Sequence, residues 1–149
     1  MITDKMNELM QILISELESK SQIHISECIK SESEISLVID PVNRLFVEIE
    51  ENGVTILYAD EHDEFWIAPS KNEEAFINDV IKFITLLLQN TILIEYVHSK
   101  NTLLSYKIWA IDKDRGQKIL LKKVTTSINP FLRLLSKSTS SKEICFKNR

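Results

Sequence analysis

The densest group of chemically active side chains in this chain is the run Asp60-Glu61-His62-Asp63-Glu64. An imidazole among carboxylates can ligate a divalent metal ion or move protons in acid–base catalysis. If the run is a β-strand, alternate side chains share a face. That face then carries Asp60, His62, Glu64 and Trp66. No second histidine or carboxylate group in the sequence has metal-ligand spacing, so we interpret the run as a charged strand at a sheet edge, where charge discourages pairing with another sheet.

The sequence contains no residue pattern for the other common kinds of catalytic site. The sequence has no G-x-S-x-G segment, and His24 and Cys28, if they lie on one strand, are about 13 Å apart along the chain. Two glycines among 149 residues are too few for a phosphate-binding loop, which needs glycine for close backbone approach. We therefore expect no catalytic residue, no resident metal and no cofactor, and we predict that the protein is not an enzyme.

The two cysteines, Cys28 and Cys145, lie far apart and have neither zinc-site nor redox-motif spacing. This usage is typical of reduced thiols in a cytoplasmic protein, although a Cys28–Cys145 disulfide stays open.

The N-terminus has no basic region before an apolar run. The most apolar stretch, residues 83–88, is far shorter than the roughly 20 residues of a membrane-spanning helix. We predict a cytoplasmic location and no membrane partner.

Two long helices and a short one are expected to position these side chains. Apolar residues recur with helical spacing from Met6 to Leu17, which predicts a helix over residues 3–20. Ser70 and Glu73 have the spacing of a capping box, so a second helix should begin at Ser70 and run to residue 89. Pro130 can begin a short helix that ends near residue 135.

Elsewhere the apolar period is two, as in half-buried strands. The segments with this pattern are residues 23–29, 35–39, 45–51, 54–59, 62–67, 92–97, 102–111 and 117–125. Short turns rather than helices join most of them, which favours antiparallel pairing. We predict an α+β fold with a mostly antiparallel sheet, an N-terminal helix and one long central helix packed on it, and a short C-terminal helix. Residues 1–135 should form a single domain, followed by a loosely ordered tail over residues 136–149.

Asn52-Gly53 lies between two β-rich segments and predicts a type I′ hairpin, whose turn needs positive φ at both central residues. A two-residue loop here would place Ile49 opposite Ile56 and Val47 opposite Tyr58. The core residues expected from both periodicities are Leu13, Leu17, Ile25, Leu37, Val47, Ile49, Ile56, Tyr58, Phe76, Val80, Ile84, Leu87, Ile94 and Ile108.

Charge is divided unevenly along the 149 residues, whose net charge is −4 at pH 7. Residues 48–79 contain ten acidic side chains and one basic one, and residues 100–149 contain three acidic and twelve basic ones. The two segments could neutralise each other on the folded surface, or each could face a partner of opposite charge. The basic segment lacks the interleaved aromatic residues of a nucleic-acid stacking surface. Nucleic-acid binding through Lys118, Lys122, Lys123 and Arg133 is therefore disfavoured.

The acidic segment favours a basic protein as its partner. Aromatic side chains among charges are typical of an interface with a buried anchor and a polar rim. Adjacent strand residues point to opposite faces, so Trp66 is the expected anchor and Phe65 the expected core residue. The expected partner-binding residues are Glu48, Glu50, Asp60, Glu61, His62, Asp63, Glu64 and Trp66. The basic C-terminal third is the alternative surface, and the sequence leaves the oligomeric state open.

Several segments resemble a group of small bacterial proteins in their overall character. They are residues 45–49 (LFVEI), 54–58 (VTILY) and 62–65 (HDEF), the helix from Ser70, and residues 92–96 (ILIEY). In an acidic, short α+β chain without catalytic motifs, they resemble the cytosolic immunity proteins of polymorphic toxin and contact-dependent inhibition systems, over residues 45–110. The resemblance implies tight binding of one cognate toxin domain without catalysis, and it carries over no particular residue.

Two other interpretations stay open. The chain also resembles secretion chaperones of helix–sheet–helix order, which are small and acidic, although the strand run before the central helix is longer than theirs. A metal-dependent hydrolase centred on His62, with Asp63 and Glu64, is the enzymatic alternative.

Overall fold

The computed structural model describes residues 1–66, 72–127, 129, 131 and 134–148. The chain forms two units, an N-terminal unit of Met1–Leu88 with Phe146–Arg149 and a C-terminal unit of Gln89–Cys145. This division differs from the expected single domain over residues 1–135, because it falls after Leu88 and because the last residues return to the first unit. The predicted α+β class is confirmed: two antiparallel sheets accompany an N-terminal and a central helix.

The N-terminal helix, α1 (Asp4–Ser15), continues into a π-helical turn, η1 (Glu16–Lys20). Thr3 caps it, since its Oγ1 accepts a hydrogen bond of 3.2 Å from the backbone N–H of Met6. The predicted apolar stripe is buried, and it comprises Met6, Leu9, Met10, Leu13 and Leu17. The predicted helix is therefore confirmed, with its last turn in the wider π form.

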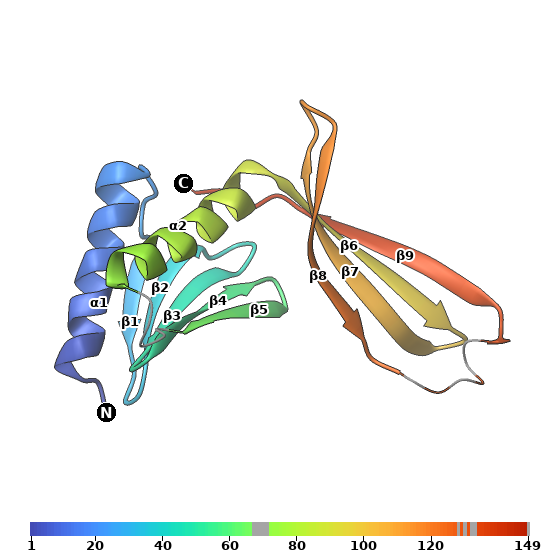
Figure 1. Cartoon of the computed structure of the whole chain (residues 1–149), viewed down its shortest axis with the longest axis horizontal. Coiled ribbons are helices and arrows are strands. Elements are labelled where there is room, and N and C mark those ends of the chain that lie inside the picture. Colours follow the sequence, from blue (N-terminus) through green and yellow to red (C-terminus); the bar gives the residue numbers. More distant parts are fainter. Residues whose placement is uncertain (67–71, 128, 130, 132–133, 149) are drawn as a thin grey trace. The chain divides into compact units, whose positions relative to one another are not determined.

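The N-terminal unit contains an antiparallel five-stranded sheet in which neighbours in sequence are neighbours in space (Figure 1). Its strands are β1 (Glu27–Lys30), β2 (Ile35–Asp40), β3 (Leu45–Glu50), β4 (Gly53–Tyr58) and β5 (Glu61–Trp66). The buried residues of β3 alternate along the strand, as the sequence pattern predicts. β5 is an edge strand, as expected for its charged sequence.

The β3–β4 hairpin has a different register from the predicted one. Glu50 pairs with Gly53, so the loop residues are Glu51 and Asn52, and Ile49 faces Val54 rather than Ile56. Neither Asn52 nor Gly53 has a positive φ, so the predicted type I′ turn is wrong. The register differs by two residues, which preserves the predicted faces because side chains alternate with a period of two.

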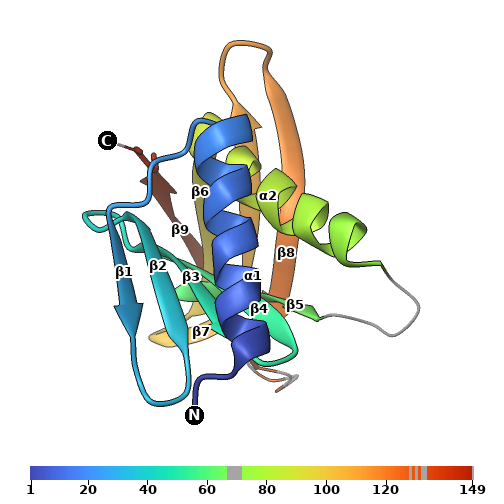
Figure 2. The same ribbon diagram turned by 90° about the vertical axis from the view of Figure 1, so that its left-hand side faces the viewer.

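Both helices pack on the same face of this sheet. The Phe83 ring of α2 (Glu73–Gln89) lies 5.7 Å from the ring of Tyr58 and 5.6 Å from that of Phe65, measured between centroids. On α1, the Sδ atom of Met10 lies 3.6 Å from Sγ of Cys28 in β1. Figure 2 shows α1 in front of the strands on this side. The opposite face of the sheet has neither helix on it.

The first turn of α2 is capped by Asn72, whose Oδ1 accepts a hydrogen bond of 2.7 Å from the N–H of Ala75. The predicted cap was Ser70, which lies outside the described residues. All fourteen predicted core residues are buried, Ile25 being the most exposed of them at 9%. Sequence periodicity thus identified the core even where it missed a cap.

The C-terminal unit is an antiparallel four-stranded sheet with the strand order β8-β7-β6-β9. Its strands are β6 (Thr91–Ser99), β7 (Thr102–Asp112), β8 (Gln117–Thr125) and β9 (Lys137–Ile144). The first three confirm the predicted strands. Of the predicted short C-terminal helix, Pro130, its expected start, and residues 132–133 lie outside the described residues, and the described elements include no helix after α2.

The predicted loose tail over residues 136–149 is also wrong for residues 137–144, which form β9 alongside β6. Only Ile144 of this strand is buried. The strand is therefore held by backbone hydrogen bonds to β6 rather than by an apolar face, and it has no hydrophobic period for sequence analysis to detect.

After β9 the chain returns to the N-terminal unit. The backbone N–H of Lys147 donates a hydrogen bond of 2.7 Å to Oδ2 of Asp40. Asn148 donates through Nδ2 to the carbonyl of His24 and accepts from the N–H of the same residue, both at 2.7 Å. Asp40, only 3% exposed, also accepts from Asn43, so one carboxylate joins the β2–β3 turn to the C-terminal tail.

Candidate protein-binding surface

The face of the five-stranded sheet opposite the helices gathers carboxylates around apolar side chains. Strand pairing places on it, from β3 to β5, the residues Phe46, Glu48, Glu50, Thr55, Leu57, His62, Glu64 and Trp66, which we call the acidic face. Among the described strand residues that pairing places on this side of the sheet, none is lysine or arginine. A surface with this make-up attracts positively charged partners.

Glu48 and Glu64 lie in one row across the sheet, separated by Thr55 of β4. Burial raises the pKa of Glu48, and the nearby carboxylates Glu34 and Glu50 raise it further, while His62 lowers it. The charged form of Glu48 is thus disfavoured in the free protein. A cation placed beside it would stabilise that charged form, which couples binding of a basic group to ionisation of this residue.

Trp66 is the large aromatic residue of the acidic face and is 55% exposed. Its indole lies over Gly53, because a Cβ atom built on Gly53 would be 3.0 Å from Cε3 of the ring. Its Nε1 donates a hydrogen bond of 3.2 Å to Oε2 of Glu64. The ring is therefore held in place before any partner arrives, which lowers the entropic cost of using it as an anchor.

Phe65, the neighbour of Trp66, points the other way, as the sequence predicts. Its ring packs against Phe83 of α2 with a centroid distance of 5.6 Å. The alternation along β5 is regular, with Glu61, Asp63 and Phe65 half-buried and His62, Glu64 and Trp66 exposed. The aromatic pair is thus divided between the core and the acidic face.

Three of the eight residues predicted to bind a partner lie off the acidic face. Glu61 and Asp63 are on the helical side of β5, where Asp63 accepts a hydrogen bond of 2.8 Å from the Tyr58 hydroxyl. Asp60 is in the β4–β5 turn and forms an ion pair of 2.9 Å with Arg44. The structure brings together the other five, Glu48, Glu50, His62, Glu64 and Trp66.

Two apolar residues and a glycine complete the surface and were not predicted as part of it. Phe46 and Leu57 share the row of His62. Their signal was present in the sequence, since the period of two places Phe46 beside Glu48 on the outward face. The role of Gly53 had no such signal, because the residue that lies over it, Trp66, is thirteen positions further along the chain.

The donor geometry does not support a metal site on β5. His62 and Asp63 point to opposite faces of the strand. Within the described ranges, no three His, Cys, Asp or Glu side chains are arranged so that they could hold a metal ion. Cys28 and Cys145 are not joined in a disulfide. The hydrolase interpretation centred on His62 therefore gains no support from the described part of the chain.

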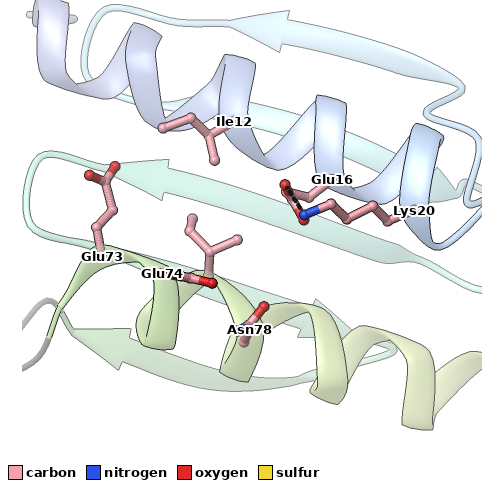
Figure 3. A pocket seen from close by; sticks show the side chains of 7 residues that line it. Ile12, Glu16, Lys20, Glu73, Glu74 and Asn78 are labelled. Carbon is pink, nitrogen blue, oxygen red and sulfur yellow. Dashed lines mark ion pairs between the residues drawn. The ribbon is translucent and has the colours of Figure 1, made fainter.

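A groove between the helices is an alternative site in the N-terminal unit (Figure 3). It has a volume of about 280 Å³. Its lining comprises Ile12, Glu16, Lys20, Glu73, Glu74, Ile77 and Asn78. Lys20 is paired with Glu16 at 2.9 Å, and the lining contains no nucleophile with an adjacent base. None of the predicted binding residues lies in this groove.

Comparison with known proteins adds no relative: no family model, curated protein or solved structure matches the chain. Neither α1 nor α2 has the length and apolar character that a membrane crossing requires, and this holds for all helices in the described residues. The function is therefore argued from the surface chemistry of the chain itself.

Proposed function

We propose that this chain is a non-catalytic binding protein that neutralises a basic partner protein, as an immunity protein does with its cognate toxin. One observation carries the proposal: Trp66 is exposed and held in place at the margin of a sheet face that has carboxylates but no described lysine or arginine. A rigid aromatic residue surrounded by polar groups is a frequent energetic centre of protein interfaces.

The two kinds of side chain on the acidic face contribute differently to binding. Glu48, Glu50 and Glu64 attract a basic partner over a distance and speed its association. Trp66 acts after contact, when burial of its indole in a pocket of the partner slows dissociation. The protein would inhibit by occupying the active site or the substrate-binding face of a toxin domain, without chemical change to either protein.

The setting we propose for this activity is the bacterial cytoplasm, where a toxin must be blocked inside the cell that makes it. Cys28 and Cys145 are not joined in a disulfide, which is usual for cysteines in such a reducing compartment. A toxin gene next to the gene for this chain would identify the candidate partner. Its purified catalytic domain would then be the ligand for the binding experiment.

The experiment compares the binding of that domain to the wild-type chain and to Trp66→Ala by titration calorimetry. Trp66→Ala is expected to weaken binding by at least about 2 kcal/mol while the circular dichroism spectrum stays unchanged, because the ring is on the surface. Val42→Ala is the matched control, since Val42 is 71% exposed in the β2–β3 turn and is not a residue of the acidic face. Equal affinities of wild type and Trp66→Ala would overturn the proposal.

A further inference from the structure

The division of charge in this protein follows the division into structural units. The N-terminal unit contains 18 acidic and 8 basic residues, a net charge of −10, and the C-terminal unit contains 4 acidic and 10 basic residues, a net charge of +6. The two units therefore carry net charges of opposite sign. The C-terminal surface is not used by the proposed function, and its chemistry can be considered by itself.

One face of the C-terminal sheet carries most of the lysines that lie in its strands. Strand pairing places Glu95, Lys107, Trp109, Lys118, Leu120 and Lys123 on this face, which we call the lysine face. Lys118 is satisfied within the protein, because its Nζ lies 3.3 Å from Oε1 of Glu95 and 4.2 Å from the centroid of the Trp109 ring. Lys107 also lies near this ring, with its Nζ 6.0 Å from the ring centroid, and it is paired across the strands with Glu95 of β6.

Lys107 of β7 lies directly opposite Lys123 of β8. Like charges in this position repel each other and destabilise the strand pair. Both side chains are exposed, and no ion pair joins either of them to a described acidic residue. A carboxylate supplied from outside the chain would remove the repulsion.

A second, independent feature of the lysine face is a buried hydrogen-bond donor without an acceptor. The indole Nε1 of Trp109 is buried and has no hydrogen-bond partner in the described structure. Buried donors are nearly always paired in folded proteins. A carboxylate that reached this atom would supply the missing acceptor.

The lysine face is also hollowed beside Lys107. A cavity of about 250 Å³ is lined there by side chains that include Glu95, Val97, Ser105 and Ser141. Lys107 is also part of this lining, and its ammonium group can make a cation–π contact with an aromatic ring that enters the cavity. The ligand that fits the lysine face therefore has carboxylates and an aromatic residue on one surface.

The acidic face of the same protein has this composition, with Glu48 and Glu64 in one row and Trp66 exposed next to them. We propose that the lysine face binds the acidic face of a second copy of this chain. Glu48 and Glu64 of one copy lie against Lys107 and Lys123 of the other, and Trp66 enters the cavity beside Lys107. The proposal goes beyond binding of a basic partner and does not depend on it.

Self-association of this kind would regulate the acidic face. A second copy would cover the surface that we propose for the basic partner. Binding of the partner to monomers would therefore shift the equilibrium away from the assembled form. The contact would be strongly dependent on salt, because the Debye length falls from about 10 Å at 0.1 M to about 3 Å at 1 M.

The first experiment is sedimentation velocity of the full chain, alone, at about 0.1 M and about 1 M salt. We expect species larger than the monomer at low salt and the monomer at high salt. Glu48→Lys with Glu64→Lys, and separately Lys107→Glu with Lys123→Glu, should each weaken self-association at least about tenfold. The matched controls are Glu8→Lys with Glu32→Lys and Lys100→Glu with Lys142→Glu, which make the same charge changes at exposed positions off both faces and should retain it.

The second experiment mixes the two charge-reversed proteins. Each should be monomeric alone. In the mixture, both faces of the Glu48→Lys, Glu64→Lys protein are positive and both faces of the Lys107→Glu, Lys123→Glu protein are negative. The two proteins therefore complement each other, and assembly should return. A wild-type chain that is monomeric at low salt would overturn the proposal, as would a mixture that does not assemble. Binding of a single-stranded oligonucleotide that is lost in Lys107→Glu with Lys123→Glu, without self-association of the wild type, would assign the lysine face to nucleic acid and would also overturn it.

Discussion

Gly53 is the residue whose loss should most directly disturb the acidic face. A Cβ atom there would be 2.5 Å from the carbonyl oxygen of Phe65 and 3.0 Å from the Trp66 ring. Gly53→Ala is expected to destabilise the protein by about 1–3 kcal/mol and to move the indole. Urea unfolding measures the first effect, and Trp66 fluorescence in a Trp109→Phe background measures the second.

Gly116→Ala provides the contrast for that experiment. Gly116 has a φ of +65° with nothing within 4 Å of a built Cβ, so its substitution adds backbone strain of about 1 kcal/mol without touching Trp66. The emission of Trp66 should then be unchanged. A Gly53→Ala protein with wild-type stability and wild-type emission would show that the indole does not depend on this glycine.

The charged form of Glu48 is energetically unfavourable in the free protein, and this makes the stability of the fold depend on pH. Burial, then Glu34 and Glu50, raise its pKa above the value in the unfolded chain. A carboxyl group with a raised folded-state pKa destabilises the fold at higher pH, and this penalty disappears as the pH falls through that raised value. Glu48→Gln should therefore stabilise the free protein at neutral pH, by no more than about 1 kcal/mol because the site is partly solvated.

Urea unfolding at neutral pH and at a pH below the raised pKa checks this expectation. The advantage of Glu48→Gln should be present at neutral pH and should fade in acid, where Glu48 of the wild type is protonated. Glu32→Gln is the control, because Glu32 is exposed in the β1–β2 turn. An advantage that grew on acidification would contradict the assignment of Glu48 as a group with a raised pKa.

At the scale of elements, Asp40 links the turn after β2 to the C-terminal tail. Burial raises its pKa, but hydrogen bonds from the backbone of Lys147 and from Asn43 outweigh burial, and the net effect is a lowered pKa. A lowered pKa means that the carboxylate stabilises the fold above its unfolded-state pKa, and that this contribution is lost as the pH falls through the folded-state value. Asp40→Ala should cost about 1–3 kcal/mol at neutral pH, because it leaves the Lys147 N–H without its acceptor.

Proteolysis and urea unfolding together test the role of Asp40. Residues 146–148 should become accessible to carboxypeptidase in Asp40→Ala, and the difference in stability from the wild type should shrink in acid. Asp114→Ala is the control, since Asp114 is exposed in the β7–β8 turn. An Asp40→Ala protein with a protected C-terminus would show that Asn148 alone is sufficient to hold the tail.

The elements that sequence analysis predicted are those with an apolar period. Strands β2 to β4 and the buried side of α2 follow from it, and so does the outward position of Trp66. β9 could not be predicted, because residues 137–143 are polar and exposed and the strand exists through its pairing with β6. The β3–β4 register was not predicted either, and the close approach of Gly53 to the backbone of Phe65 and the ring of Trp66 involves β5, a strand outside the hairpin.

The candidate site was predicted in part for the same reason. The period of two correctly grouped His62, Glu64 and Trp66 on one side of β5. It failed for Asp60, since Tyr58 pairs with Glu61 and Asp60 is therefore a loop residue rather than a strand residue. Where the strand begins is decided by the turn, in which Ala59 adopts a φ of 58°, and composition alone did not indicate this.

At the scale of the whole molecule, the opposite charges of the two units predict how a basic partner approaches. The N-terminal unit, at −10, attracts it and the C-terminal unit, at +6, repels it. Reversal of Glu48 and Glu64 to lysine should slow association and flatten its salt dependence. Reversal of Lys107 and Lys123 to glutamate should instead speed association at low salt and leave the dissociation rate unchanged, because these lysines act on the partner only through their long-range field.

Stopped-flow association rates against ionic strength measure both effects, at protein concentrations low enough for the chain to be monomeric. The rates of the two variants should differ most in dilute salt and converge near 1 M, where screening shortens the Debye length to about 3 Å. Faster dissociation of the Lys107→Glu, Lys123→Glu protein would place these lysines in contact with the partner. The binding surface would then include the lysine face of the C-terminal unit.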